Sequence, residues 1–318
     1  MARVAGVSTA VVSYVLNDGP RPVSAAAKAR VLAAVEELNY RPDGVARTLA
    51  AGRSRTVGLV VPDVSMPYFA TGAQEITQEA ARRGYQVLVA TTGWDLEAER
   101  RQLLALAERR VEALILMSVD PTQGDEFLGK LGAPVVVVDR PGVALDGAEA
   151  VTAHLLEHGH RRVGYIGGRA DLVVSQRREQ GWRAGLRAGG IRSATSWITR
   201  GPYTEQGGYD AVDVLLKAPA RCTALFAEND VQALGALRRL RELGRQVPGD
   251  IAVATLDSSS LARFSSPSLT ALEQPHRKMG TRTLDVGLGG EPLVHRIDVQ
   301  GFELVRRESC GCRSTDEA

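Results

Sequence analysis

The protein has 318 residues, of which 44% are apolar and 24% charged, which argues against one compact domain and against a mostly disordered chain. Its longest apolar runs, such as VGLVV and APVVVV, are far shorter than the roughly 18 residues of a membrane span, and no signal-like apolar core follows Met1, so we expect a cytoplasmic protein. Basic residues outnumber acidic ones by only two in the whole chain, 39 against 37. Residues 1–55, however, hold eight basic and four acidic residues, a net charge of +4, so we expect this N-terminal segment to bind a polyanion.

The N-terminal segment predicts three short helices. Residues 2–6 permit a helix, Gly6 permits a tight turn, and Ser8 can cap a second helix over residues 9–16. Residues 24–39 predict an amphipathic helix with Ser24 as its N-cap and an apolar face of Ala27, Val31, Ala34, Val35 and Leu38. The order is helix, turn, helix and a third helix, although STAVVSYV alone also fits a core helix of any small domain.

Residues 40–55, YRPDGVARTLAAGRSR, predict a domain linker. Pro42 can open one or two helical turns, and the run from Gly52 to Arg55 has no packing face.

From Val57 onward, apolar runs alternate with helical segments. The predicted strands cover 57–61, 87–90, 114–117, 135–138, 163–166, 223–226 and 251–254. Between them lie amphipathic helices, for example residues 97–111, where Leu103, Leu104, Leu106 and Ala107 share a face. Such an alternation predicts parallel sheets covered on both faces, and periodicity alone leaves one barrel and two doubly wound domains open.

Three stretches in order, AGVSTAVVSYVLN, VSAAAKARVLAAVEELNYRPDGVARTLA and TVGLVVPDVSMPYFA, resemble the lactose/galactose repressor (LacI/GalR) family of bacterial transcription factors. The resemblance implies a helix-turn-helix head and a hinge helix, joined to an α/β two-lobed body like a periplasmic binding protein, with parallel sheets. The implied domains are a DNA-binding domain over 1–41, a hinge and linker over 42–55, an N-terminal lobe over 56–150 plus about 276–290, a C-terminal lobe over 151–275 plus about 291–309, and a tail over 310–318.

By matching positions, the resemblance assigns DNA contacts to two segments. In the second helix the implied residues are Ser8, Thr9, Ala10, Ser13, Tyr14 and Asn17, with Thr9, Ala10 and Tyr14 nearest the bases. Tyr14 stands where many family members have arginine, so a different half-site is expected. In the hinge, Val45, Ala46 and Leu49 are expected in the minor groove, with Leu49 as the wedge.

The resemblance also implies an effector site between the lobes. Its residues would be Ser65, Tyr68, Phe69, Arg178, Tyr203, Asn229 and Asp257. Packing would also explain the aromatic residues, helix capping would explain Asn229, and surface ion pairing would explain Arg178 and Asp257. Asp257 lies in TLDS, where the family more often shows GYDD or GFDD.

No cofactor, metal or catalytic residue is predicted. His154 and His158 lie one helical turn apart, but His160 opens a strand, no acidic or sulfur ligand follows at a suitable spacing, and the Cys310-Gly-Cys312 tail is separate. A nucleophile elbow, a phosphate-binding loop and HExxH are missing from the sequence, which argues against an enzyme, and a periplasmic binding protein would lack the basic head.

The sequence departs from the family in three places. About a dozen residues are missing between VALDG and AEAVTAHLLEHGH, and the segment RTLDVGLGGEPLVHR looks trimmed. The family's first helix normally begins earlier, so we expect Met1 to be an internal valine whose GTG codon was taken as a start, with further codons upstream.

Together these features predict a homodimeric, nucleoid-associated repressor. Its heads would bind a pseudo-palindromic DNA operator, and each body would bind a small effector, a sugar or related metabolite. The alternative is a solute-binding protein or sugar sensor whose truncated head does not bind DNA.

Overall fold

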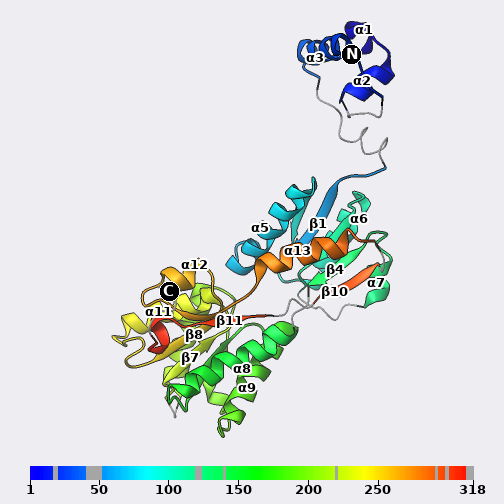
Figure 1. Ribbon diagram of the computed structural model, residues 1–318. Coiled ribbons are helices and arrows are strands. Elements are labelled where there is room, and N and C mark those ends of the chain that lie inside the picture. Colours follow the sequence, from blue (N-terminus) through cyan, green and yellow to red (C-terminus); the bar gives the residue numbers. More distant parts are fainter. Residues whose placement is uncertain are drawn as a thin grey trace. The chain divides into compact units, whose positions relative to one another are not determined.

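The computed structural model describes residues 1–16, 21–40, 52–118, 124–138, 141–218, 221–290, 293–297 and 301–312. The chain divides into two compact units, a head over Met1–Arg55 and a body over Thr56–Ala318 (Figure 1). The division falls where the sequence predicts the end of the linker. Within the described ranges, no helix is long and apolar enough to cross a membrane.

The head contains the three predicted helices, α1 (Ala2–Ala5), α2 (Thr9–Leu16) and α3 (Ala25–Glu37). Gly6 ends α1 in the left-handed conformation, with φ of 61°. The Ser8 hydroxyl accepts a hydrogen bond from the Val11 amide at 3.3 Å, and the Ser24 hydroxyl accepts one from Ala27 at 3.3 Å. Both predicted N-caps are therefore confirmed.

A small apolar core holds these helices together. Ala5, Val31 and Ala34 are buried, and Val11 and Val15 of α2 pack against them. Leu38, which the sequence assigned to the same face, is 45% exposed, because α3 ends at Glu37. The core is small for an independent domain, so each buried side chain contributes a large share of the head's stability.

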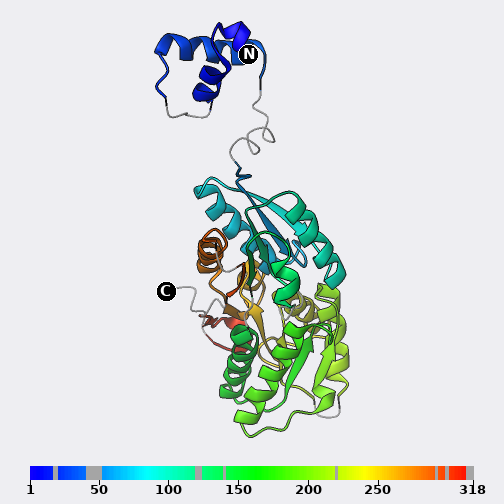
Figure 2. The same ribbon diagram turned by 90° about the vertical axis from the view of Figure 1, so that its right-hand side faces the viewer.

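The described part of the body contains two sheets (Figures 1 and 2). The first has the order β10-β4-β3-β1-β2 and is parallel throughout. The second has the order β11-β9-β8-β7-β5-β6 and is parallel except for the antiparallel pair β9–β11. The strands are β1 (Thr56–Val61), β2 (Gln86–Thr91), β3 (Ala113–Leu116), β4 (Val135–Val138), β5 (Val163–Gly167), β6 (Ile198–Arg200), β7 (Ala224–Ala227), β8 (Ala252–Asp257), β9 (Thr270–Glu273), β10 (Val294–Ile297) and β11 (Glu303–Val305).

Helices cover both faces of each sheet, as expected for parallel strands buried on both sides. On the first sheet, α5 (Pro67–Arg82) and α13 (His276–Gly287) share one core, and α6 (Leu96–Glu108) and α7 (Asp125–Gly129) share the other. On the second sheet, α8 (Pro141–Glu157) packs against α9 (Val173–Ala188), and α10 (Glu205–Leu216) packs against α11 (Asp230–Glu242). The shorter elements are α12 (Ser260–Phe264), η1 (Thr195–Trp197) and η2 (Glu308–Cys310). Leu104 is 48% exposed, so the predicted face of α6 is narrower than expected.

The structure differs from the predicted lobe boundaries at two places. Helix α8 runs unbroken from Pro141 to Glu157 and packs on the second sheet, so residues 141–150 belong to the second lobe and not to the first. Strand β10 pairs with β4, so residues 294–297 belong to the first lobe, although the sequence placed 291–309 in the second. The chain therefore passes between the lobes after β4, after β9 and after β10.

Candidate functional site

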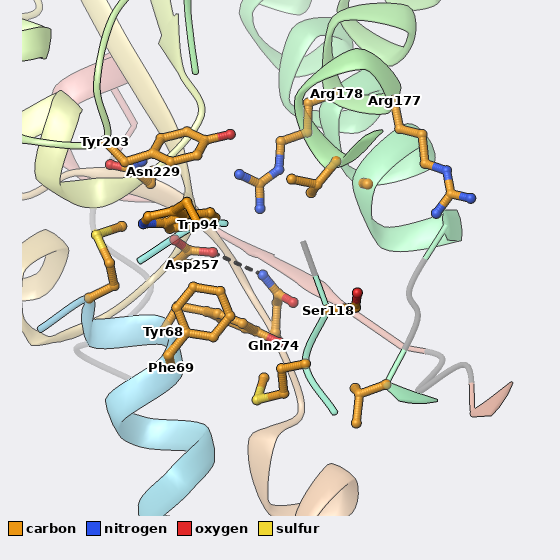
Figure 3. Close-up of a pocket in the computed structure, with 15 residues that line it drawn as sticks. Tyr68, Phe69, Trp94, Ser118, Arg177, Arg178, Tyr203, Asn229, Asp257 and Gln274 are labelled. Carbon is orange, nitrogen blue, oxygen red and sulfur yellow. Dashed lines mark hydrogen bonds between the residues drawn. The ribbon is translucent and has the colours of Figure 1, made fainter. Parts of the chain in front are cut away.

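A cleft lies between the two lobes (Figure 3). Most of its lining residues lie at or just beyond the carboxyl ends of the parallel strands, the usual ligand position in such sheets. It spans about 820 Å³, part of which is open to solvent. Its lining residues come from the start of α5, the ends of β4 and β8, the loops after β2, β3, β6, β7 and β9, helix α8 and the first turns of α9. The site is thus assembled from both lobes.

Four aromatic rings form an arc along the cleft. Tyr68 and Phe69 meet edge to face with centroids 4.9 Å apart, and Phe69 contacts Trp94 at 5.6 Å. Trp94 of the first lobe in turn contacts Tyr203 of the second lobe at 5.0 Å. Trp94 adopts φ of 65°, a left-handed conformation that is strained for a bulky side chain, and such strain concentrates at functional sites.

A buried carboxylate, Glu228, organises the polar side of the cleft. It accepts hydrogen bonds from the hydroxyls of Tyr165, of Ser175 at 2.6 Å and of Tyr203 at 2.6 Å. Nη1 of Arg178 lies 3.8 Å from Glu228 Oε2. Glu228 thereby holds both the aromatic ring of Tyr203 and the guanidinium of Arg178 in place.

Burial and charge both act on the ionisation of these groups. Burial raises the pKa of the Tyr203 hydroxyl well above its usual value, and the carboxylate of Glu228 raises it further. Burial opposes the charge of Arg178, but the neighbouring carboxylates of Asp257 and Glu228 outweigh it and raise the pKa of the guanidinium. The hydroxyl therefore stays protonated and the arginine stays charged.

Two nitrogen atoms at the cleft have no hydrogen-bond partner within the described part of the chain, Nε of Arg178 and Nδ2 of Asn229. Figure 3 shows the guanidinium of Arg178 pointing toward Tyr203, whereas that of Arg177 points away. The Oδ1 atom of Asn229 is already used, because it caps α11 by accepting from the Gln232 amide at 2.8 Å. Since unpaired buried donors are costly, these nitrogens are suited to bind a ligand.

Asp257 lies at the end of β8 and faces the same space. Its Oδ1 accepts a hydrogen bond from Nε2 of Gln274 at 3.1 Å (Figure 3). Asp257 and Ser258 have φ of 86° and 50°, so the backbone turns sharply after the strand. Gln274 lies where the chain passes from β9 to α13, and it therefore couples the acidic group to a crossover between the lobes.

The structure brings six of the seven predicted effector residues to the cleft: Tyr68, Phe69, Arg178, Tyr203, Asn229 and Asp257. Ser65 is not among its lining residues, because its amide and hydroxyl both bond to Asp63 Oδ1 at 2.8 Å, in a turn before α5. The sequence patterns did not indicate Trp94, Ser118, Arg177 and Gln274, which also line the cleft, or the buried Glu228. Trp94, Ser118, Glu228 and Gln274 lie one to three residues after strands β2, β3, β7 and β9, and this position was the available signal. Arg177 lies within α9 and had no such signal.

The predicted DNA-contacting residues of α2 lie on its outer face. Ser8, Thr9, Ala10 and Ser13 are exposed, and Tyr14 is partly exposed. Val11, Val12 and Val15 are partly buried and pack against the core of the head, so α2 has one packed face and one exposed face, as a recognition helix requires. Asn17 and the hinge residues Val45, Ala46 and Leu49 lie outside the described residues.

Comparison with known proteins identifies the family. Residues 1–43 match the model for "Bacterial regulatory proteins, lacI family", and residues 152–310 match a periplasmic binding protein-like domain. The HTH-type transcriptional repressor PurR of Haemophilus influenzae is 32% identical, covering 96% of this chain and 96% of its own length. The ribose operon repressor of Escherichia coli (strain K12) is 33% identical, covering 93% and 92%.

The chain belongs to the lacI family of bacterial regulatory proteins. Among solved structures, the transcriptional regulator CelR–cellobiose complex is 31% identical, with a TM-score of 0.68, and covers 97% of this chain and 98% of its own. The lac repressor dimer bound to operator and the anti-inducer ONPF is 26% identical, with a TM-score of 0.83 and 97% of each chain covered. The resemblance found in the sequence is confirmed.

As a member of the lacI family, the protein is a DNA-binding transcriptional repressor with an effector-binding body. Its relatives are repressors and not enzymes. The comparisons do not support the alternative of a solute-binding protein with a non-functional head, because the curated repressors align with both the head and the body.

Proposed function

We propose that this lacI-family repressor binds a polyhydroxylated small molecule, a sugar or related metabolite, in the cleft between its lobes. The observation that carries the proposal is the position of an aromatic arc opposite Arg178, Asn229 and Asp257 in one cleft. The C–H face of a sugar ring packs on aromatic rings, while neighbouring hydroxyls bind planar guanidinium, amide and carboxylate groups in pairs. The similar regulator CelR forms a complex with cellobiose, a sugar, which supports the same ligand class.

A planar heterocycle is the competing ligand class, since stacking on Trp94 and Tyr203 would also recognise it. The polar groups favour the sugar, because a cation, an amide donor and a carboxylate together match several hydroxyls that each donate and accept. A ligand screen therefore has to include both classes.

We propose further that α2 contacts operator bases in the major groove and that two chains bind a pseudo-palindromic operator on the chromosome as a homodimer. The exposed face of Thr9, Ala10, Ser13 and Tyr14 supports this role for α2. Effector and operator each favour one arrangement of the lobes, so their binding free energies are coupled, typically by about 1–3 kcal/mol.

A ligand screen on the full-length protein tests the effector assignment. Mono- and disaccharides, nucleobases and nucleosides are compared by thermal shift, and hits are titrated by calorimetry. We expect a sugar to raise the melting temperature and to change operator affinity. Asn229→Asp keeps the cap of α11 but removes the Nδ2 donor. It should lower the affinity for the sugar by at least about tenfold, because one hydrogen bond to a buried group is lost.

Ser65→Ala is the matched control, because Ser65 belongs to the family motif but bonds to Asp63 away from the cleft lining. It should leave sugar affinity unchanged. Stabilisation by nucleobases alone, or equal sugar affinity in Asn229→Asp and wild type, would refute the proposal.

A further inference from the structure

Two histidines and two cysteines meet at the end of α8. His154 lies in the last turn of α8, and His158 follows one helical turn later, just beyond the helix. Cys310 ends η2, and Cys312 follows after Gly311, whose φ of 92° turns the chain back. In the sequence these pairs look like separate features, because more than 150 residues lie between them.

The four ligand-type atoms, one from each side chain, lie within 4.8 Å of one another. Nε2 of His154 is 3.2 Å from Sγ of Cys310, and Nε2 of His158 is 3.2 Å from Sγ of Cys312. The diagonal distance from Cys312 Sγ to His154 Nε2 is 3.8 Å. Each thiol therefore faces an imidazole nitrogen, and the two pairs adjoin.

The three nitrogen–sulfur distances, 3.2, 3.2 and 3.8 Å, lie close to the edges of a coordination tetrahedron, and the other ligand atoms lie within 4.8 Å of one another, so that small side-chain shifts would close the site around an ion. With Zn–S bonds of about 2.3 Å and Zn–N bonds of about 2.0–2.1 Å, the ligand atoms of a tetrahedral site lie about 3.3–3.8 Å apart. A tetrahedral set of two thiolates and two imidazoles is typical of structural Zn²⁺, and it disfavours Mg²⁺ and Ca²⁺, which prefer oxygen ligands.

The burial of the cluster also fits a structural site. His154 and Cys310 are 4% and 3% exposed, whereas His158 is exposed and Cys312 is half-buried. The site therefore has a closed inner side and an outer side through which an ion can enter. His154 Nδ1 has no hydrogen-bond partner in the described ranges and lies 3.9 Å from the carboxylate of Glu157, which is placed to orient the ring as an outer-shell group.

We propose that His154, His158, Cys310 and Cys312 form a structural Zn²⁺ site that fastens the C-terminal segment to α8. With four protein ligands, the ion has no open position for catalysis. Binding releases the proton of each thiol to solvent, since Cys coordinates as the thiolate.

The fastened segment reaches the effector cleft through the hydrogen bonds of its neighbours. Ser309 donates to the Val253 carbonyl of β8 at 2.6 Å, and Arg307 donates to the hydroxyl of Ser258 at 3.0 Å. Ser258 directly follows Asp257 of the cleft. The metal site thus supports the segment that holds the end of β8.

Metal content and cobalt spectroscopy test this proposal on the full-length protein, produced without a polyhistidine tag and kept reduced. We expect one zinc per chain by elemental analysis. Exchange for Co²⁺ should give the visible absorption of a tetrahedral site and a near-ultraviolet thiolate-to-cobalt band. Removing zinc with a chelator should lower the melting temperature, and adding Zn²⁺ alone should restore it.

Cys312→Ser and His158→Gln alter the two more accessible ligands, which leaves the buried pair in place. Each variant should lower the affinity for Zn²⁺ by more than about 100-fold, because even the loss of an outer-shell hydrogen bond to a ligand costs about 10–100-fold in metal affinity. His160→Gln and Cys222→Ala are matched controls, since His160 bonds to Thr223 at 3.1 Å and Cys222 lies in the core, both outside the cluster.

Three results would overturn the proposal. They are a reduced protein without zinc or a thiolate–cobalt band, zinc retained at full affinity in both ligand variants, and a Cys310–Cys312 disulfide that leaves one free thiol of three in the protein as isolated.

Discussion

Arg178→Met is expected to destabilise the body, because it leaves the buried carboxylate of Glu228 without its cation. Nη1 of Arg178 lies 3.8 Å from Glu228 Oε2, and Glu228 is fully buried. Breaking a buried pair costs about 3–5 kcal/mol. The hydroxyls of Tyr165, Ser175 and Tyr203 still donate to Glu228 in the variant, so we expect about 3 kcal/mol, the lower end of that range.

The loss corresponds to a fall in melting temperature of about 6–12 °C, at about 2–4 °C per kcal/mol for a domain of this size. Differential scanning calorimetry of Arg178→Met, Glu228→Gln and the double variant completes a double-mutant cycle. Because Glu228→Gln removes the stranded charge, the double variant should be more stable than Arg178→Met. Purely additive losses would show that the two groups do not interact, and the electrostatic account of the cleft would be wrong.

Three further variants test other parts of the structure. Burial and the nearby Asp257 raise the pKa of Asp230 to about 8, against about 3.9 in the unfolded chain. Between these two pH values only the folded state holds the proton, so the free energy of unfolding should fall as the pH rises from about 4 to about 8. Asp230→Asn should make this fall smaller, as measured by urea titrations at several pH values. A Cβ on Gly168 would lie 2.1 Å from Cζ of Tyr203, so Gly168→Ala should displace the tyrosine ring. The variant should lose about 1–3 kcal/mol of stability and bind the effector more weakly in calorimetry, and unchanged effector affinity would contradict this. Val31→Ala opens the small core of the head and should weaken operator binding in mobility-shift assays at unchanged effector affinity, whereas its exposed neighbour Leu32→Ala should not.

Local signals allowed the sequence to predict much of the fold. The N-caps Ser8 and Ser24 and the turn at Gly6 act within four residues, and the central strands consist of continuous apolar runs. Strands β6, β9, β10 and β11 were missed. All four strands are only three or four residues long. Strands β6, β10 and β11 also lie at sheet edges, where each pairs with a strand on one side alone, so their sequences show little hydrophobic periodicity.

Sites that depend on distant parts of the chain were predicted less completely. The family resemblance assigned Tyr68, Arg178 and Asn229 to the effector site by matching motif positions, and the structure has all three among the residues that line the cleft. The role of Glu228 was not predicted, because it depends on hydrogen bonds from three hydroxyls that lie in three other segments of the chain. The cysteine and histidine cluster was missed for the same reason, because only the folded chain brings residue 154 beside residue 310.

The placement of the three tryptophans gives the protein a built-in optical signal. Trp182 and Trp197 are 0% and 7% exposed in the core of the second lobe, where their surroundings do not depend on the first lobe. Trp94 is partly exposed, and its ring touches Tyr203 across the cleft. A change in lobe separation therefore alters the fluorescence of Trp94 while the other two indoles supply a constant background, so closure can be followed in real time without an added dye.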